Sequence, residues 1–190
     1  MGTIILSDNV SLDGVIQDPV GDEGFARGGW VGLISSRPEL ARLTLEEALR
    51  TDAMLMGRRT YEWFASRWPS RTGELADRLN GLPKYVVSST LRDPEWQNST
   101  VVETDLLDQV ARLKNAFSGD IVIPASVRIA RVLIEHDLVD ELRLKVFPVV
   151  LGAGERLFGE TTGTRGFRLV GARTLDGDTT SLLFERVPEA

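Results

Sequence analysis

The chain has 190 residues, of which 42% are hydrophobic and 26% are charged, and its formal net charge is −6. This length predicts one domain over residues 1–190 with a core of its own, and the negative charge argues against nucleic acid or an anionic membrane as a partner. With no cysteine and a single histidine, the sequence excludes disulfides, thiolate metal sites and histidine-rich metal sites, and we expect no metal. The N-terminus carries no secretory signal pattern, so we expect a cytoplasmic protein.

Apolar runs and turn residues alternate along the first half of the chain in the manner of an α/β protein. Residues 3–7 (TIILS) predict a buried strand, and the glycine-rich residues 13–30 predict a loop that is either mobile or tightly turned. The T-L-E-E pattern at Thr44 is a capping box, which predicts that a short helix begins there. A strand over residues 53–57 and a helix over residues 58–68 are predicted next.

The second half of the chain continues this alternation and then changes character. Three further strands are predicted, over residues 84–89, 99–103 and 120–123. Helices are predicted to follow Asp105 and Ser126, which are suitable N-cap residues. Residues 141–147 (ELRLKVF) alternate apolar and charged side chains, as a half-buried strand does. Residues 176–178 (DGD) predict a hairpin between two late strands, so the sequence favours an α/β fold with a mixed sheet.

The junction after the strand at residues 53–57 reads Gly57-Arg58-Arg59-Thr60. A helix start presents unpaired N–H groups and the positive end of the helix dipole, which is an unfavourable place for two cations unless an anion binds there. Glycine lets a phosphate approach the backbone, and arginine offers forked donors to phosphate oxygens. Alternatively, two surface arginines simply open an amphipathic helix. This tetrapeptide alone leaves the two interpretations about level.

Two more strand ends carry small or hydroxylated residues. Residues 88–90 (SST) close one strand and are followed by Arg92, while Ala125 and Ser126 separate another strand from its helix. Ligands of open α/β sheets bind beyond the carboxyl ends of the strands, so we expect these junctions to share one crevice. The plain alternatives are turn formation by residues 88–90 and capping by Ser126. Together the three junctions favour a phosphate-rich cofactor.

Four segments match a known family in order and spacing: SLDGVI at 11–16, MGRRTYE at 56–62, VVSST at 86–90, and LVDELRL…PVVLGAGERLF at 138–158. On these motifs the chain resembles the dihydrofolate reductase superfamily, and most closely its branch with the reductase domain of bacterial riboflavin biosynthesis. The resemblance covers nearly the whole chain. It implies a three-layer α/β fold with helices on both faces of a central mixed sheet and a C-terminal β-hairpin. It also implies NADPH as cofactor, hydride transfer to a small heterocyclic or carbonyl substrate, and a homodimer joined through the late strands or their helices.

The resemblance further implies which residues contact the ligands. The expected cofactor-binding residues are Gly14, Ile16, Gly57, Arg58, Arg59, Thr60, Ser88, Ser89, Arg92, Ala125, Ser126 and Val127. Trp30 ends the glycine-rich loop and is interpreted as a lid or pocket aromatic near the substrate, with a water between it and the loop as the proton source. Asp13 is interpreted as a turn former, with contact to the substrate as the less favoured alternative.

Two departures from the family pattern bear on function. Ala125 stands where the family usually has glycine, and because alanine resists positive φ this favours slightly a non-catalytic, nucleotide-binding member of the fold. Ser35 and Ser36 stand near the place of the carboxylate that holds the pterin ring in dihydrofolate reductases, which argues against folate. The nearest enzymatic alternative is pyrimidine reduction in riboflavin synthesis, which requires a basic pocket for a ribose phosphate.

Overall fold

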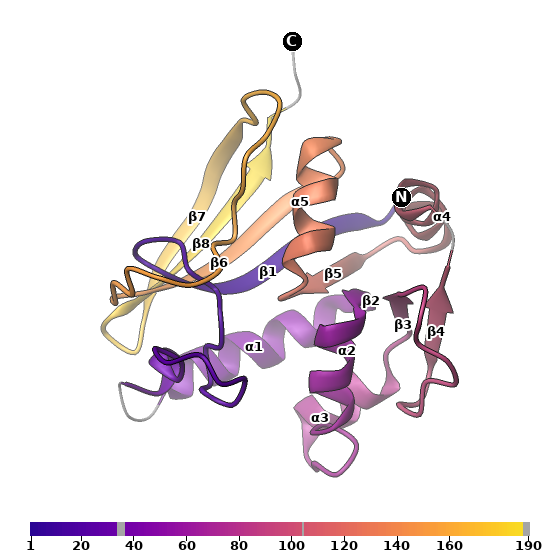
Figure 1. Cartoon of the computed structure of the whole chain (residues 1–190), viewed down its shortest axis with the longest axis horizontal. Coiled ribbons are helices and arrows are strands. Elements are labelled where there is room, and N and C mark those ends of the chain that lie inside the picture. Colours follow the sequence, from indigo (N-terminus) through magenta and orange to yellow (C-terminus); the bar gives the residue numbers. More distant parts are fainter. Residues whose placement is uncertain (34–36, 104, 188–190) are drawn as a thin grey trace.

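The computed structural model describes residues 1–33, 37–103 and 105–187, and its strands form one sheet in the order β4-β3-β2-β5-β1-β6-β8-β7 (Figure 1). The strands are β1 (Thr3–Ser11), β2 (Thr51–Gly57), β3 (Lys84–Val87), β4 (Ser99–Val102), β5 (Asp120–Pro124), β6 (Glu141–Phe147), β7 (Phe167–Leu175) and β8 (Thr179–Arg186). Neighbours from β4 to β6 are parallel, whereas β8 is antiparallel to both β6 and β7. The predicted mixed sheet and C-terminal hairpin are therefore confirmed.

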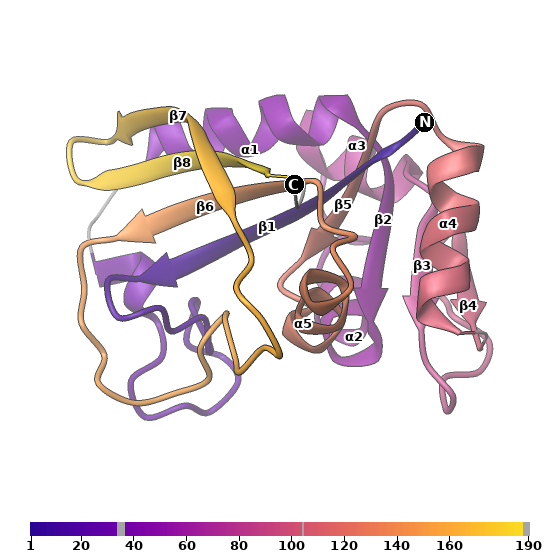
Figure 2. The ribbon, with the colours of Figure 1, turned by 90° about the horizontal axis from the view of Figure 1, so that it is seen from above.

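Helices cover both faces of the sheet, as the resemblance implied (Figure 2). They are α1 (Pro38–Arg50), α2 (Arg58–Ala65), α3 (Glu74–Gly81), α4 (Leu106–Ala116), α5 (Val127–Glu135) and a short 3-10 helix, Trp30–Leu33. Side chains of a strand point alternately to its two faces. Leu55 of β2 accordingly packs in the core under α4 and α5, and its neighbours Met54 and Met56 pack in the core formed with α1, α2 and α3.

The prediction that a helix starts at the Thr44 capping box is wrong. Thr44 lies inside α1, and its hydroxyl donates to the carbonyl of Leu40 at 2.9 Å. The helix begins six residues earlier, where the carboxylate of Asp176 accepts the N–H groups of Glu39 and Leu40 at 3.0 and 3.1 Å. This cap comes from the β7–β8 turn, and since the turn lies far along the chain, no local pattern contains it.

The other elements differ from their predictions mainly at their ends. β1 extends to Ser11, beyond the predicted residue 7, and α2 ends at Ala65 instead of residue 68. Helix α3 was not predicted. Asp105 caps α4 as predicted, accepting the N–H groups of Leu107 and Asp108 at 2.8 and 3.3 Å.

The glycine-rich loop after β1 is tightly turned. Asp18 is 2% exposed, and its carboxylate accepts the backbone N–H groups of Gly21, Asp22, Glu23 and Phe25. Residues 16–20 and Glu23 of this loop lie near the carboxyl ends of the parallel strands. Within the described ranges, no helix has both the length and the apolar character needed to cross a membrane.

Candidate active site

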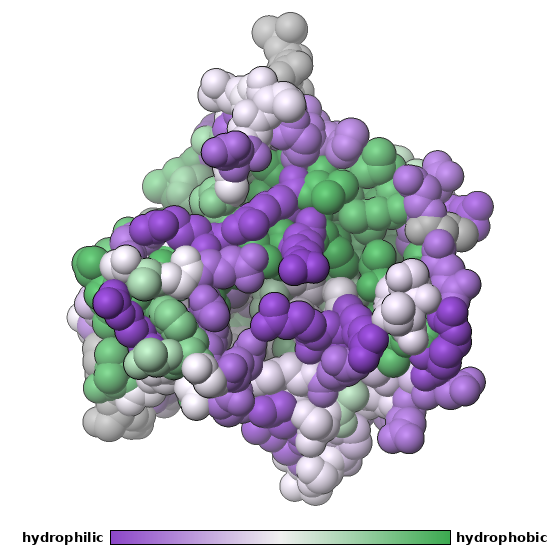
Figure 3. Space-filling view, viewed as in Figure 1, coloured by the Kyte–Doolittle hydropathy of each residue, from purple (hydrophilic) through white to green (hydrophobic). Residues whose placement is uncertain are grey.

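A cavity of about 690 Å³ lies at the carboxyl ends of the parallel strands. Figure 3 shows a hollow between α2 and α5 with hydrophilic residues around it. The strands contribute Ser7, Asp8, Asn9, Gly57, Val87, Pro124 and Lys145 to its walls. Because parallel strands all end at the same edge, residues far apart in sequence meet there. The predicted crevice is shared by two of the three junctions, those at Gly57 and Ala125, whereas residues 88–90 and Arg92 do not line it.

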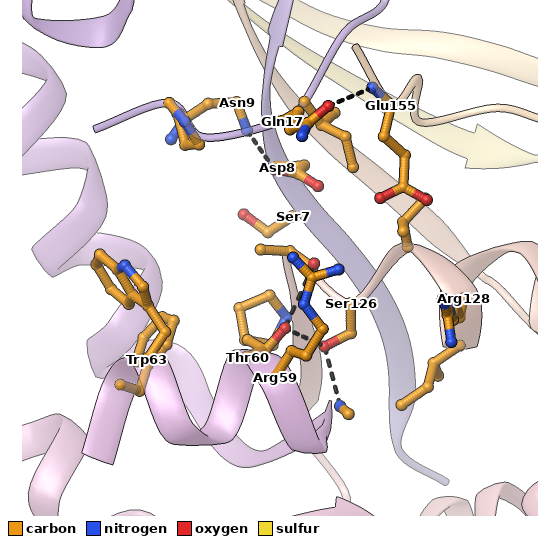
Figure 4. A pocket seen from close by; sticks show the side chains of 18 of the residues that line it. Ser7, Asp8, Asn9, Gln17, Arg59, Thr60, Trp63, Ser126, Arg128 and Glu155 are labelled. Carbon is orange, nitrogen blue, oxygen red and sulfur yellow. Dashed lines mark hydrogen bonds between the residues drawn. The ribbon is translucent and has the colours of Figure 1, made fainter. Parts of the chain in front are cut away.

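Two helix N-termini meet at this cavity and are joined by a chain of hydrogen bonds. The N–H of Gly57 donates to Ser126 Oγ at 3.1 Å, the Ser126 hydroxyl donates to Thr60 Oγ1 at 3.0 Å, and the Thr60 hydroxyl donates to the carbonyl of Ala125 at 3.4 Å (Figure 4). Ser126 therefore does not cap α5 with its side chain, contrary to its plain interpretation. Neither α2 nor α5 has a side-chain cap from the described residues, so both present N–H groups to an anion.

Gly57 is not required by the fold. Its φ is −79°, which any residue adopts, and a Cβ built there would meet Ile129 Cδ1 at 3.8 Å, an ordinary contact. Glycine is usually selected for unusual backbone angles or for close approach of another group. The first reason is absent here, and the backbone of Gly57 lies open to the cavity.

The two arginines of this junction line the cavity and also make surface ion pairs. Arg58 Nε lies 2.6 Å from Glu62 Oε1, and Arg59 Nη2 lies 3.4 Å from Glu23 Oε2. The ion pairs agree with the surface interpretation of the two arginines, and anion binding in the cavity stays a prediction. Exposed pairs of this kind contribute only about 0–1 kcal/mol, so a bound phosphate competes readily for either guanidinium.

Ala125 has a φ of +46°, a left-handed conformation usually occupied by glycine. The sequence predicted that alanine would resist positive φ, but the surrounding turn between β5 and α5 holds it there. Left-handed backbone costs about 1–2 kcal/mol for a residue with a Cβ. The alanine therefore preserves the geometry of the turn at the expense of stability, and Ala125, Ser126 and Val127 all line the cavity.

The cavity wall also contains a buried ion pair. Lys145 Nζ lies 2.6 Å from Glu47 Oε2 of α1 and donates to Ser7 Oγ at 2.8 Å, and Lys145 is 5% exposed. The prediction that Lys145 lies on the solvent face of a half-buried strand is wrong, because α1 covers that face of β6. A buried charge is tolerated when paired and hydrogen-bonded, as it is here.

Asp8 is the most unusual ionisable residue of the cavity and was missed by the sequence analysis. It is 7% exposed; Oδ1 accepts the N–H of Asn9 at 2.8 Å, and Oδ2 is buried with no hydrogen-bond partner among the described residues. Burial raises its pKa to about 7, although the Asn9 N–H and the charge of Lys145 act in the opposite direction. The signal was the triplet Ser7-Asp8-Asn9, in which polar residues directly follow an apolar run.

Of the expected cofactor-binding residues, eight line the cavity: Ile16, Gly57, Arg58, Arg59, Thr60, Ala125, Ser126 and Val127. Gly14, Ser88, Ser89 and Arg92 do not. Ser88 Oγ accepts the N–H of Leu91 at 2.9 Å, which is the plain turn interpretation, and Arg92 pairs with Glu103 at 2.6 Å.

The structure corrects the pocket interpretation of Trp30 and bears out the turn interpretation of Asp13. Trp30 is 1% exposed, packs edge-to-face on Phe147 with ring centroids 5.4 Å apart, and donates its indole N–H to the carbonyl of Gln17. It is a core residue. The carboxylate of Asp13 accepts the N–H groups of Leu151 and Gly152, bonds that hold its pKa below the usual range. Asp13 therefore shapes a turn, and neither residue lines the cavity. Ser35 and Ser36 lie outside the described residues.

Comparisons with known proteins agree with this architecture. The model of a family described as the RibD C-terminal domain matches residues 2–181. The chain is 26% identical over 186 residues to the uncharacterized protein YyaP of Bacillus subtilis, covering 95% of this chain and 93% of that protein. It is 28% identical over 122 residues to the uncharacterized protein YwjB of the same organism, covering 64% and 67%.

Solved structures share the fold at low sequence identity. A putative riboflavin biosynthesis protein from Shewanella superimposes with a TM-score of 0.73 at 23% identity, covering 98% of this chain and 99% of that one. A pyrimidine reductase-like protein from Corynebacterium diphtheriae gives 0.61 at 14%, with 98% and 92% covered. Dihydrofolate reductase from Enterococcus faecalis, complexed with NADP(H), gives 0.62 at 14%, with 97% and 96% covered. The dihydrofolate-reductase-like fold is thereby confirmed.

Proposed function

The chain belongs to the RibD C-terminal domain family, and on this premise we propose that it is an NADPH-dependent reductase that transfers a hydride to a small heterocyclic or carbonyl substrate. One observation carries the proposal: two helix N-termini and the arginines Arg58 and Arg59 converge on a single cavity at the strand ends. This is a site for several negative charges, as a dinucleotide phosphate has.

The residues present fit such a cofactor. Gly57 leaves the backbone of the β2–α2 junction open to a phosphate, and the N-terminus of α5 lies beside it through Ser126. A volume of about 690 Å³ is within the usual range for ligand cavities. NADPH supplies the hydride from its nicotinamide ring. The protein holds the phosphates at the two junctions, and the apolar side chain of Ile16 in the cavity wall helps to seat the ring.

The proposal is tested by titrating the protein with NADPH and following energy transfer from Trp63, which lines the cavity. We expect the double variant Arg58→Gln/Arg59→Gln to bind NADPH about 10- to 100-fold more weakly, because charge-assisted hydrogen bonds contribute about 1.5–3 kcal/mol each before compensation. The matched control is Arg168→Gln/Arg173→Gln, which removes two exposed arginines from β7, away from the cavity. It should leave the affinity unchanged.

Two outcomes would contradict the reductase. Absence of NADPH binding by the wild type at ~1 mM, above the common range for enzyme cofactors, would favour a non-catalytic member of the fold. If the double variant bound NADPH as tightly as the wild type, Arg58 and Arg59 would not be binding its phosphates.

A second candidate is a pyrimidine reductase of the riboflavin type. It is supported by the names of the family and of two similar structures, and by the exposed Arg128, a further cation in the cavity wall. A phosphorylated ribosylamino-pyrimidine should then stimulate NADPH oxidation more than its dephosphorylated form. Arg128→Gln should abolish that preference.

We also propose a homodimer that uses the outer hairpin strand. β7 ends the sheet and exposes Leu169 and Val170 by 51% and 42%. Exposed apolar residues on an edge strand favour pairing with another chain. Light scattering should give a dimer for the wild type and a monomer for Leu169→Lys/Val170→Lys. The control Leu49→Lys, which alters an exposed leucine of α1, should remain dimeric.

A further inference from the structure

Reduction of a C=N or C=O bond needs a proton as well as a hydride, since the heteroatom gains a bond to hydrogen. The sequence suggested a water held between the glycine-rich loop and Trp30. Trp30 lies in the core and does not line the cavity, so its side chain does not position a donor beside a substrate there. A donor must therefore be sought among the residues of the cavity wall.

Five acidic side chains line the cavity, and four of them are already engaged. Asp18 accepts backbone N–H groups of its own loop, and Glu23, Glu47 and Glu155 pair with Arg59, Lys145 and Arg131. Each of these carboxylates is therefore already held by a backbone donor or a cation. Asp8 is the exception within the described chain, because its Oδ2 is buried without a partner.

The surroundings of Asp8 favour its protonated form. It lies on β1 between Leu6 and Val10, two members of the core under α4 and α5, and it pairs in register with Leu144 of β6. The cation whose charge acts on Asp8 is Lys145, and its amine is committed to Glu47 and Ser7. A carboxyl group that is desolvated and lacks a close cation retains its proton to a higher pH. In Figure 4, Asp8 lies between Gln17 and Ser7 in the cavity wall.

We propose that Asp8 is the catalytic acid of this site, donating the proton that completes the reduction. This inference rests on the proposed reductase function. The hydride adds to the carbon of the C=N or C=O bond with both electrons, the π electrons of that bond move to nitrogen or oxygen, and this atom takes the proton from Asp8. Asp8 is left as a carboxylate that accepts the Asn9 N–H. Water reprotonates it after the product leaves.

A pH profile tests this role. NADPH oxidation is followed with two probes, 7,8-dihydropterin for C=N and benzaldehyde for C=O, from pH 5 to 9. With wild type we expect turnover to fall about tenfold per pH unit above the pKa of Asp8. Asp8→Asn should lower turnover at pH 6 by about 10²- to 10⁴-fold and flatten the profile, with the NADPH dissociation constant unchanged. The control Asp77→Asn, an exposed residue of α3, should match the wild type.

The variant separates Asp8 from the other charged groups of the cavity. These groups, the three arginines Arg58, Arg59 and Arg128, Lys145 and the paired carboxylates, are all retained in Asp8→Asn, so any pH dependence that they cause would persist in the variant. A fall in activity that persists in Asp8→Asn would assign the titration to one of those groups and overturn the proposal. Full turnover by Asp8→Asn at pH 6 would overturn it as well.

A second measurement does not depend on turnover. The infrared difference spectrum between wild type and Asp8→Asn, both saturated with NADPH, should contain the carbonyl band of a protonated carboxyl group at pH 6. If this band is absent, Asp8 is ionised at pH 6 in the NADPH complex and the proposal is overturned, whether or not a probe is reduced. If neither probe is reduced, the infrared spectrum alone tests whether Asp8 holds a proton. Failure of NADPH to bind would instead overturn the reductase function itself.

Discussion

Ser126 donates its hydroxyl hydrogen to Oγ1 of Thr60 at 3.0 Å, joining the first turns of α2 and α5 across 66 residues of sequence. The contact exists because β2 and β5 are parallel neighbours, so the helices that follow them begin side by side. Ser126 Oγ also accepts the N–H of Gly57 at 3.1 Å. One small side chain thus joins the two strand–helix junctions that line the cavity.

Replacing Ser126 by alanine should reduce stability and cofactor affinity together. The variant leaves the Gly57 N–H and the Thr60 hydroxyl without this partner, and we expect the free energy of unfolding to fall by about 1–2 kcal/mol in urea denaturation. NADPH affinity should fall several-fold as the junctions lose their register. Ser70→Ala, at an exposed serine, should change the free energy of unfolding by less than about 0.5 kcal/mol. An equal effect of the two variants would show that the Ser126 bonds contribute nothing.

Gly57→Ala should separate binding from folding. The backbone angle suits alanine and the added methyl meets only Ile129 at 3.8 Å, so the free energy of unfolding should change by less than about 0.5 kcal/mol. NADPH affinity should fall at least tenfold, because the methyl occupies space at the junction where the phosphate approaches. The control is Gly32→Ala, where a Cβ also finds no clash but does not face the cavity. Unchanged NADPH affinity in Gly57→Ala would argue against a phosphate at this junction.

Ala125→Gly should stabilise the protein. The residue has a φ of +46°, and glycine adopts this angle without the penalty of a Cβ. The greater freedom of glycine in the unfolded chain offsets part of the gain, so we expect the free energy of unfolding to rise by about 0.5–1 kcal/mol. The measurement is the urea midpoint at constant slope, with NADPH affinity retained. A lower midpoint would mean that the alanine methyl makes packing contacts that outweigh the strain.

Asp8 should make the protein less stable as the pH rises. Its pKa is raised from 3.8 to about 7 on folding, so between these values the folded state binds more protons than the unfolded state, and the free energy of unfolding falls as pH rises from about 4 to 7. The full change is on the order of 4 kcal/mol. The difference in free energy of unfolding between wild type and Asp8→Asn should therefore change between pH 4 and 7 and stay constant above pH 7. Parallel curves throughout would mean that Asp8 is ionised in the fold.

Truncation of Trp30 should affect mainly stability, and truncation of Trp63 should affect mainly ligand binding. Trp30→Ala removes a buried ring that packs on Phe147, and should lower the free energy of unfolding by about 3–5 kcal/mol. Trp63 lines the cavity and is half-buried, so Trp63→Ala should change stability by about 1 kcal/mol and alter ligand binding. The pair is compared by thermal denaturation and NADPH titration. A stable Trp30→Ala variant with impaired ligand binding would restore the pocket interpretation of Trp30.

The sequence by itself determined the features that depend on neighbouring residues. It predicted the strands at residues 53–57 and 120–123, the cap by Asp105 and the hairpin at residues 176–178. These features were predictable because strand preference, capping and turn geometry depend on a few neighbouring residues. The glycine-arginine junction was also predicted as part of the site, since a strand end and a helix start are local and the parallel order places such ends together.

Only the tertiary structure decided what covers each surface. The sequence pattern of β6 predicts that Lys145 faces solvent, but α1 covers it and places Glu47 beside its amine. Trp30 is buried because Phe147 of a distant strand packs on its ring. The pKa of Asp8 is raised because β1 occupies the middle of the sheet, where core residues from other segments help to bury its carboxyl group. Burial and charge pairing depend on contacts between residues far apart in the chain, and these contacts set the chemistry of the cavity.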